Sequence, residues 1–185
     1  NPKLLPAQIQ MGKLLVSAGQ GDKAMERAEI ILREAPGNED AQILQGAVFL
    51  AGKEYGKARA HLEGMLNRGV AKPDVYMILA ASYTRDKEYR SAEGVLVKGL
   101  KTHEKFLPMH RGLADVYMAT GRTEETASEV RKVIELEPEN YGNRITLAGL
   151  YWDTGRQAKG REVLDALLTE KPAHEGRRLD TAAFY

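Results

Sequence analysis

The chain has 185 residues, of which 43% are hydrophobic and 29% are charged, which indicates a globular domain or an array of small units rather than a disordered tail. Its 27 Lys and Arg residues are balanced by 26 Asp and Glu residues, a net charge of +1, so the basic excess that general nucleic-acid and anionic-membrane binders use is absent. With no cysteine, disulfides, thiolate zinc sites and cysteine nucleophiles are excluded, and no run approaches the roughly 18 apolar residues of a membrane span.

The chain repeats itself with a period of 34 residues. The phrase "LADVYMATGR" at 113–122 returns as "LAGLYWDTGR" at 147–156, with six of ten positions identical and a spacing of 147 − 113 = 34 residues. In this frame a small residue is followed three residues later by a large one, in the pairs Gly12/Leu15, Gly46/Phe49, Ala80/Tyr83, Ala114/Tyr117 and Ala148/Tyr151. A second small residue recurs further on, at Ala24, Ala58, Ala92, Thr126 and Gly160. Such a period is typical of a repeat architecture.

Each period predicts two amphipathic helices and no strand. The first helix runs through the small/large pair and ends near a glycine, at Gly19, Gly52, Gly121 or Gly155. After a short turn, Asp22 or Thr123 is expected to cap the second helix through its side-chain oxygen. The second helix stops before a proline, as at Pro36, Pro138 and Pro172. Small residues let the two helices approach closely, so the prediction is an all-α fold of stacked helical hairpins.

These residues resemble the tetratricopeptide repeat family, whose pattern has the same period and the same small, large, alanine and proline phases. The resemblance implies a right-handed superhelical solenoid of stacked antiparallel helix pairs. It covers nearly the whole chain in five copies, at 5–38, 39–72, 73–106, 107–140 and 141–174. The main departure is at the fourth position of each copy, where the family's Trp is replaced by Gln8, Gln42, Tyr76, His110 and Arg144.

The frame continues past both ends of the five copies. Residues 1–4 fit the end of a preceding repeat, and residues 175–185 fit either the start of a sixth repeat, in an excerpt of a longer array, or a capping helix.

In this family the first helix of each pair lines a concave groove, so the resemblance implies which side chains face a partner. The candidates are Ile9, Lys13, Val16, Ile43, Leu44, Ala47, Leu50, Met77, Ile78, Ala81, Arg85, Arg111, Asp115, Met118, Ile145, Gly149, Trp152 and Asp153. Most are apolar, and this composition suits an amphipathic helix or an extended peptide. The alternative for any single Ile or Leu is packing between adjacent first helices, while for Trp152 we expect exposure to the groove.

The groove lacks the residues with which some family members clamp a partner's C-terminal carboxylates. Of the residues at the corresponding places, only Lys13 is a cation, so we do not expect that clamp. Lys13, Arg85 and Arg111 remain candidates to anchor acidic groups singly, the alternative being solvated helix residues.

We expect a non-enzymatic scaffold that binds a protein or peptide and uses no cofactor or metal. The stretch "GQGDKA" at 19–24 follows a helix rather than a strand, which excludes a dinucleotide fingerprint, and the four histidines show no ligand spacing. The alternative is a structural spacer or self-association module of a larger envelope or secretion complex. Resemblance to long bacterial repeat proteins of export and exopolysaccharide systems slightly favours the periplasm over the cytoplasm.

Overall fold

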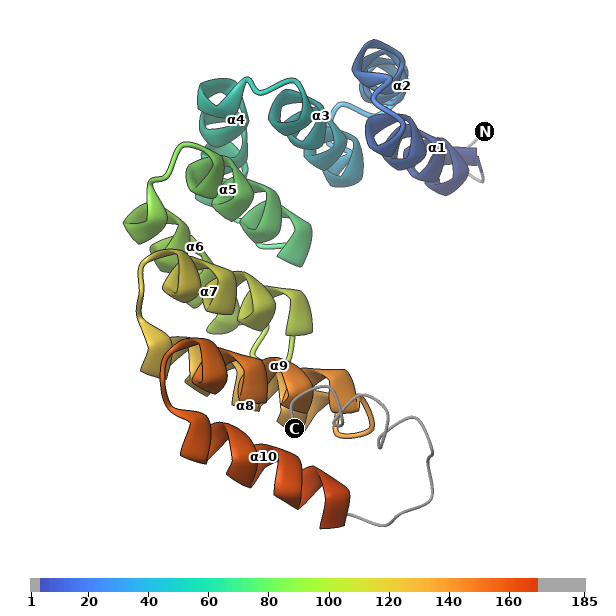
Figure 1. Ribbon diagram of the computed structural model, residues 1–185. Coiled ribbons are helices and arrows are strands. Elements are labelled where there is room, and N and C mark those ends of the chain that lie inside the picture. Colours follow the sequence, from blue (N-terminus) through green and yellow to red (C-terminus); the bar gives the residue numbers. More distant parts are fainter. Residues whose placement is uncertain (1–3, 170–185) are drawn as a thin grey trace. The chain divides into compact units, whose positions relative to one another are not determined.

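The computed structural model describes residues 4–169, and these form ten α-helices and no strand. The helices divide into two compact units, called here unit 1 (Asn1–Glu104) and unit 2 (Lys105–Tyr185). Unit 1 contains α1 (Leu5–Ser17), α2 (Gly21–Glu34), α3 (Glu39–Ala51), α4 (Tyr55–Asn67), α5 (Pro73–Arg85) and α6 (Tyr89–Leu100) (Figure 1). Unit 2 contains α7 (Leu107–Ala119), α8 (Thr123–Leu136), α9 (Tyr141–Asp153) and α10 (Gln157–Thr169). The all-helical prediction is confirmed, and each expected repeat holds one pair of helices joined by a short turn. The expectations for residues 1–3 and 170–185 lie outside the described residues.

The helix ends follow local chemistry, with three departures from expectation. Gly19, Gly121 and Gly155 do adopt positive φ after a first helix, but Gly52 does not, and the left-handed residue there is Lys53 at φ 61°. Neither Asp22 nor Thr123 caps its helix, because each lies inside the first turn rather than before it. Their short polar side chains indicate the right region of the chain, but the helices begin slightly earlier than these residues suggest.

The start of α3 carries a side-chain cap at a residue that was not expected to provide one. Asn38 Oδ1 accepts a hydrogen bond from the Ala41 amide at 2.9 Å and so caps α3. Asn is among the strongest residues at this position, because its oxygen reaches an amide that has no partner within the helix.

The small residues of the repeat frame are where helices approach one another. Ala24, Ala58, Ala92 and Thr126 are completely buried. A Cβ added at Gly46 would come within 2.8 Å of Leu62 Cδ2, so α3 and α4 pack as closely as a glycine allows. At Gly160 the added atom would lie 3.1 Å from the Ala148 carbonyl oxygen, which brings α10 against the backbone of α9. The predicted reason for these small residues is therefore confirmed.

In three repeats, polar contacts join the two helices where the family has its Trp. In each of these contacts, the residue on the second helix comes 19 residues after the residue at the fourth position of the repeat. These contacts are Arg27 to the Gln8 amide oxygen, His61 to the Gln42 carbonyl, and His110 to Glu129. A polar contact thus links the two helices of each of these three hairpins, through a side chain at Gln8 and His110 and through the backbone at Gln42.

The two units stack their first helices differently. In unit 1, α3 packs against both α1 and α5, so three first helices form one continuous layer. Within the described part of unit 2, no Cα atom of α7 lies within 8 Å of one of α9, and these two helices are connected through α8. This difference decides the shape of the two pockets described below.

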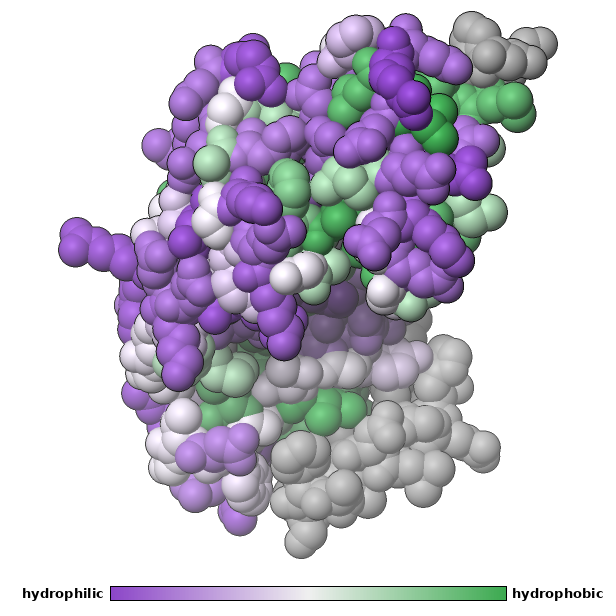
Figure 2. Space-filling view, turned by 90° about the horizontal axis from the view of Figure 1, so that it is seen from above, coloured by the Kyte–Doolittle hydropathy of each residue, from purple (hydrophilic) through white to green (hydrophobic). Residues whose placement is uncertain are grey.

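Helix α1 leaves apolar side chains exposed to solvent. Figure 2 shows a mainly hydrophilic face with hydrophobic side chains exposed in places. Met11 and Leu14 of α1 are 49% and 65% exposed. Their counterparts two or three periods later, such as Leu79 and Val116, are buried. The α1 side chains therefore have the character of a packing surface that nothing among the described residues covers.

Candidate functional site

The first helices of unit 1 together form an apolar pocket of about 240 Å³. It is lined by Lys13, Val16, Ile43, Leu44, Ala47, Asp74, Met77 and Ile78, which come from α1, α3 and α5. Ile43 and Leu44 form its floor, since they are 3% and 1% exposed. An apolar cavity of roughly 150 Å³ is large enough for benzene, so this pocket has room for one large apolar side chain.

Leu44 shows how the floor of this pocket is built. A Cβ added at Gly12 would come within 2.2 Å of Leu44 Cδ2, so the Leu44 side chain fills the notch that Gly12 leaves in α1. Ile43 on the same helix packs with Leu62 and Met65 of α4 in the core of unit 1. Ile43 and Leu44 thus fill the space between neighbouring helices, and part of each side chain also lines the pocket.

An ion pair crosses this apolar pocket. Lys13 Nζ of α1 lies 3.0 Å from Asp74 Oδ2 of α5, and both side chains are about half exposed, at 46% and 49%. Lys13 is thus paired with Asp74 in this structure, and an acidic group of a partner would compete with Asp74 for it. The partner was missed because Lys13 and Asp74 are 61 residues apart, and only stacking brings them together.

The remaining candidates of unit 1 do not line this pocket. Ile9 is 6% exposed and packs with Ile31 and Ala41 in a core cluster, so it belongs to the interior rather than to a groove. Leu50 and Ala81 are half-buried, and Arg85 is exposed at the end of α5.

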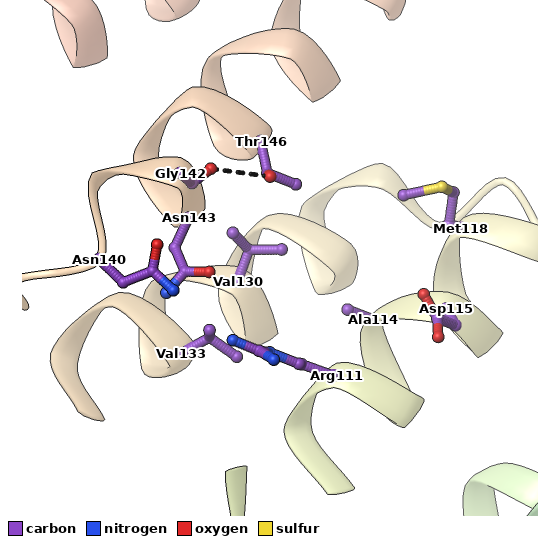
Figure 3. A pocket seen from close by; sticks show the side chains of 10 residues that line it. All are labelled: Arg111, Ala114, Asp115, Met118, Val130, Val133, Asn140, Gly142, Asn143 and Thr146. Carbon is purple, nitrogen blue, oxygen red and sulfur yellow. Dashed lines mark hydrogen bonds between the residues drawn. The ribbon is translucent and has the colours of Figure 1, made fainter. Parts of the chain in front are cut away.

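Unit 2 contains a larger and more polar pocket, of about 520 Å³ (Figure 3). Its lining is Arg111, Ala114, Asp115, Met118, Val130, Val133, Asn140, Gly142, Asn143 and Thr146, contributed by α7, α8, α9 and the turn before α9. Because α7 and α9 are apart, the pocket reaches down to Val130 and Val133 of α8. Arg111, Asp115 and Met118 were predicted groove residues, and the structure brings them together.

One carboxylate organises the polar side of the unit 2 pocket. Glu137, at the end of α8, accepts hydrogen bonds at Oε2 from Arg111 at 2.8 Å and from Asn140 and Asn143 at 3.2 Å each. An acidic group of a partner would therefore compete with Glu137 for Arg111. Sequence reasoning missed Glu137 and the two amides because none of them occupies a groove-facing position of a first helix.

Asp115 stands on the other side of the same pocket. Figure 3 shows Asp115 one helical turn beyond Arg111 on α7, with the Arg111 side chain extending toward Val133. Removal of water by the surrounding groups raises the pKa of the Asp115 carboxyl above its ordinary value. Neighbouring Met118 is 52% exposed and presents its thioether to solvent.

The candidates of α9 are not part of the unit 2 pocket lining. Trp152, expected to face the groove, is half-buried and leans on α10 instead. A Cβ at Gly160 would lie 3.1 Å from its ring, and the Arg161 guanidinium lies 5.8 Å from its ring centroid. Ile145 and Gly149 are half-buried and Asp153 is exposed.

Two further classes of site are missing from the described part of the chain. Residues 4–169 contain no group of three or more His, Cys, Asp or Glu side chains arranged to hold a metal ion. No described helix is long and apolar enough to cross a membrane.

Comparison with known proteins agrees with this architecture. Two family models, both of the tetratricopeptide repeat, match residues 9–75 and 117–180 and together cover more than half of the chain. No curated protein sequence matches significantly.

Several solved structures are similar to this chain in fold. One is TTC0263, a thermophilic tetratricopeptide repeat protein of Thermus thermophilus, with 21% identity and a TM-score of 0.67 over 97% of each chain. Another is MamA from Desulfovibrio magneticus RS-1, with 13% identity and a TM-score of 0.69 over 92% of this chain and 97% of that one. A third is YrrB, described as a repeat protein with an unusual peptide-binding site, with 19% identity and a TM-score of 0.62 over 95% of this chain and 89% of that one.

Helix pairs on a 34-residue period, with pockets opening between first helices, define a helical-repeat scaffold for protein–protein interaction. The chain belongs to the tetratricopeptide repeat family.

Proposed function

We propose that the chain is a non-catalytic scaffold that holds a peptide or helix of a partner protein against the first helices of unit 1. The observation that supports this most directly is the apolar pocket, in which three successive repeats contribute Val16, Leu44 and Ile78 to one cavity. Such a cavity accepts one anchoring side chain from an amphipathic segment, which is the common way that apolar grooves recognise helices and peptides.

The experiment is selection from a displayed library of random dodecapeptides, followed by affinity measurement with the selected peptides. Ala47 is half-buried in the pocket lining, so Ala47→Glu fills the cavity with a charged side chain without removing a core residue. Ala51→Glu makes the same change at an exposed residue at the end of the same helix and is the matched control.

The expected result is that Ala47→Glu weakens binding of the selected peptides by about tenfold or more, while Ala51→Glu changes it less than about twofold. Both variants should retain the helical circular dichroism of the parent. Equal affinity of parent and Ala47→Glu for every selected peptide would show that the pocket is not the binding site.

A second candidate function, self-association, is supported by the exposed face of α1. Met11 and Leu14 occupy frame positions that are buried in later repeats, so another helical surface is the expected neighbour. Sedimentation velocity over a concentration series tests it. The candidate predicts assembly of the parent, loss of assembly in Leu14→Lys, and no change in Val97→Lys, which alters a 40% exposed residue of α6. A parent that remains monomeric throughout the series excludes it.

A further inference from the structure

The unit 2 pocket contains a carboxylate without a counter-charge. Among residues 4–169, no ion pair or hydrogen bond joins Asp115 to another side chain. The loss of water around its carboxyl raises the pKa of that group. Asp115 is exposed at the pocket, so its carboxylate is accessible to a cation that enters the pocket.

The other charges that face this pocket cancel one another. Arg111 of α7 is bound by Glu137 of the α8 end, at 2.8 Å. The lining residues from α9 are Gly142, Asn143 and Thr146, which carry no charge. The Thr146 hydroxyl is occupied within its own helix, since it donates to the Gly142 carbonyl at 2.9 Å (Figure 3). Counting the lining residues that the structure describes together with Glu137, the net charge of the pocket is therefore that of Asp115.

The remainder of the lining is suited to an aliphatic stem. Ala114, Val130 and Val133 make the inner wall, and Met118, one helical turn beyond Ala114 on α7, stands beside Asp115 at the mouth. A flexible, polarisable Met adapts to the chain of methylene groups that a Lys or Arg carries below its charge. The volume of about 520 Å³ is ample for one such side chain.

We propose that the unit 2 pocket binds a lysine or arginine side chain of a partner polypeptide, with the Asp115 carboxylate accepting its charged hydrogen bonds and Met118 packing on its stem. An acidic side chain would face Asp115 and would have to displace Glu137 from Arg111. A purely apolar side chain would cover Asp115 and leave its carboxylate without a hydrogen-bond donor, which is costly. A basic residue alone matches both halves of the lining.

This site is separate from the apolar pocket of unit 1, so the two proposals can fail independently. The probe is the same random dodecapeptide library, selected on the parent protein, with dissociation constants measured by fluorescence anisotropy. The test variant is Asp115→Asn, which removes the charge at nearly constant shape. The matched control is Glu135→Gln, the same charge change at an exposed residue of α8 outside the pocket lining.

If the proposal is correct, a class of selected peptides shares one Lys or Arg, and Asp115→Asn weakens their binding by about tenfold, while Glu135→Gln changes it less than about twofold. Replacing the shared basic residue by norleucine should cost the same factor on the parent and almost nothing further on Asp115→Asn. Binding to the parent should also weaken as the pH falls and Asp115 takes up a proton, whereas Asp115→Asn should lack this dependence.

Three results would overturn the proposal. One is a selection that yields no binding peptide or none sharing a basic residue. Another is an equal loss of affinity in Asp115→Asn and Glu135→Gln. The third is a norleucine penalty of the same size on the parent and on Asp115→Asn, since that would place the basic residue elsewhere on the protein.

Discussion

The first helices of unit 1 pack directly against one another, whereas those of unit 2 stand apart and leave a larger pocket between them. Both units follow the same 34-residue frame, and both bury the small residues that the frame prescribes. The difference lies at the fifth and sixth positions of each repeat. In unit 1 these include the large apolar pair Ile43 and Leu44, and in unit 2 they include Gly112 and Thr146.

The consequence of those side chains can be followed at one contact. Leu44 of α3 fills the notch at Gly12 of α1. At the equivalent frame positions in unit 2 stand Thr146 of α9 and Ala114 of α7, and both line the pocket instead of closing it. The same backbone plan thus gives an apolar pocket in one unit and a larger, more polar one in the other, because the side chains between adjacent first helices differ.

The large residue of the frame offers the strongest test of this comparison. Tyr117 of α7 is 8% exposed and its ring lies 4.3 Å from the Arg122 guanidinium, whereas its counterpart Tyr83 in α5 is only half-buried. Tyr117→Ala should cost about 3–5 kcal/mol of unfolding free energy, and Tyr83→Ala clearly less, because less packing is removed. Urea denaturation measures both, and equal losses would contradict the difference in burial.

The polar contact between the two helices of a hairpin, present in three repeats, gives the next effect. His110 and Glu129 are 6% and 8% exposed in their side chains, and Nδ1 donates to Oε2 at 2.7 Å. Glu129→Ala should cost about 1–3 kcal/mol, because it removes the carboxylate from a buried pair. The corresponding contact in unit 1, between Arg27 and Gln8, is exposed, so Arg27→Ala should change stability by less than about 0.5 kcal/mol. Thermal melts that rank these two variants in the opposite order would refute this assignment.

Two glycines should respond with opposite sign. At Gly46 a Cβ meets the fully buried Leu62 at 2.8 Å, so Gly46→Ala should destabilise unit 1 by about 1 kcal/mol net, overpacking outweighing better helix propensity. At Gly149 nothing lies within 4 Å, so Gly149→Ala should stabilise α9 by about 0.5–1 kcal/mol. Denaturant midpoints of the two variants should move in opposite directions. A higher midpoint for both variants would show that α3 and α4 pack more loosely at Gly46 than this structure indicates.

The ion pair across the unit 1 pocket should contribute least. Lys13 and Asp74 are both about half exposed, so Lys13→Met should change the unfolding free energy by less than about 1 kcal/mol, and the change should shrink as salt is added. Stability measured at low and high ionic strength checks this. A large, salt-independent loss would mean that the pair holds α1 and α5 in place rather than lying loosely over the pocket.

Much of the fold was predictable because it depends on residues close together in the sequence. The positions of Ala24, Ala58 and Ala92, and the helix pairs around them, follow from the period alone. The site was less predictable. Trp152 packs against α10, because Gly160 leaves space beside its ring. Ile9 is buried in the core, because Ile31 and Ala41 pack against it. In each case the deciding neighbour lies on another helix.

Paired helices on a 34-residue period could be predicted from the residues of one repeat, because helix periodicity, helix ends and close approach are set within a single repeat. Tertiary structure decided how far apart successive first helices stand, since that distance depends on side chains from two repeats at once. It thereby decided that Lys13 meets Asp74, that Arg111 is bound by Glu137, and that Asp115 is left facing a pocket with no counter-charge among the described residues.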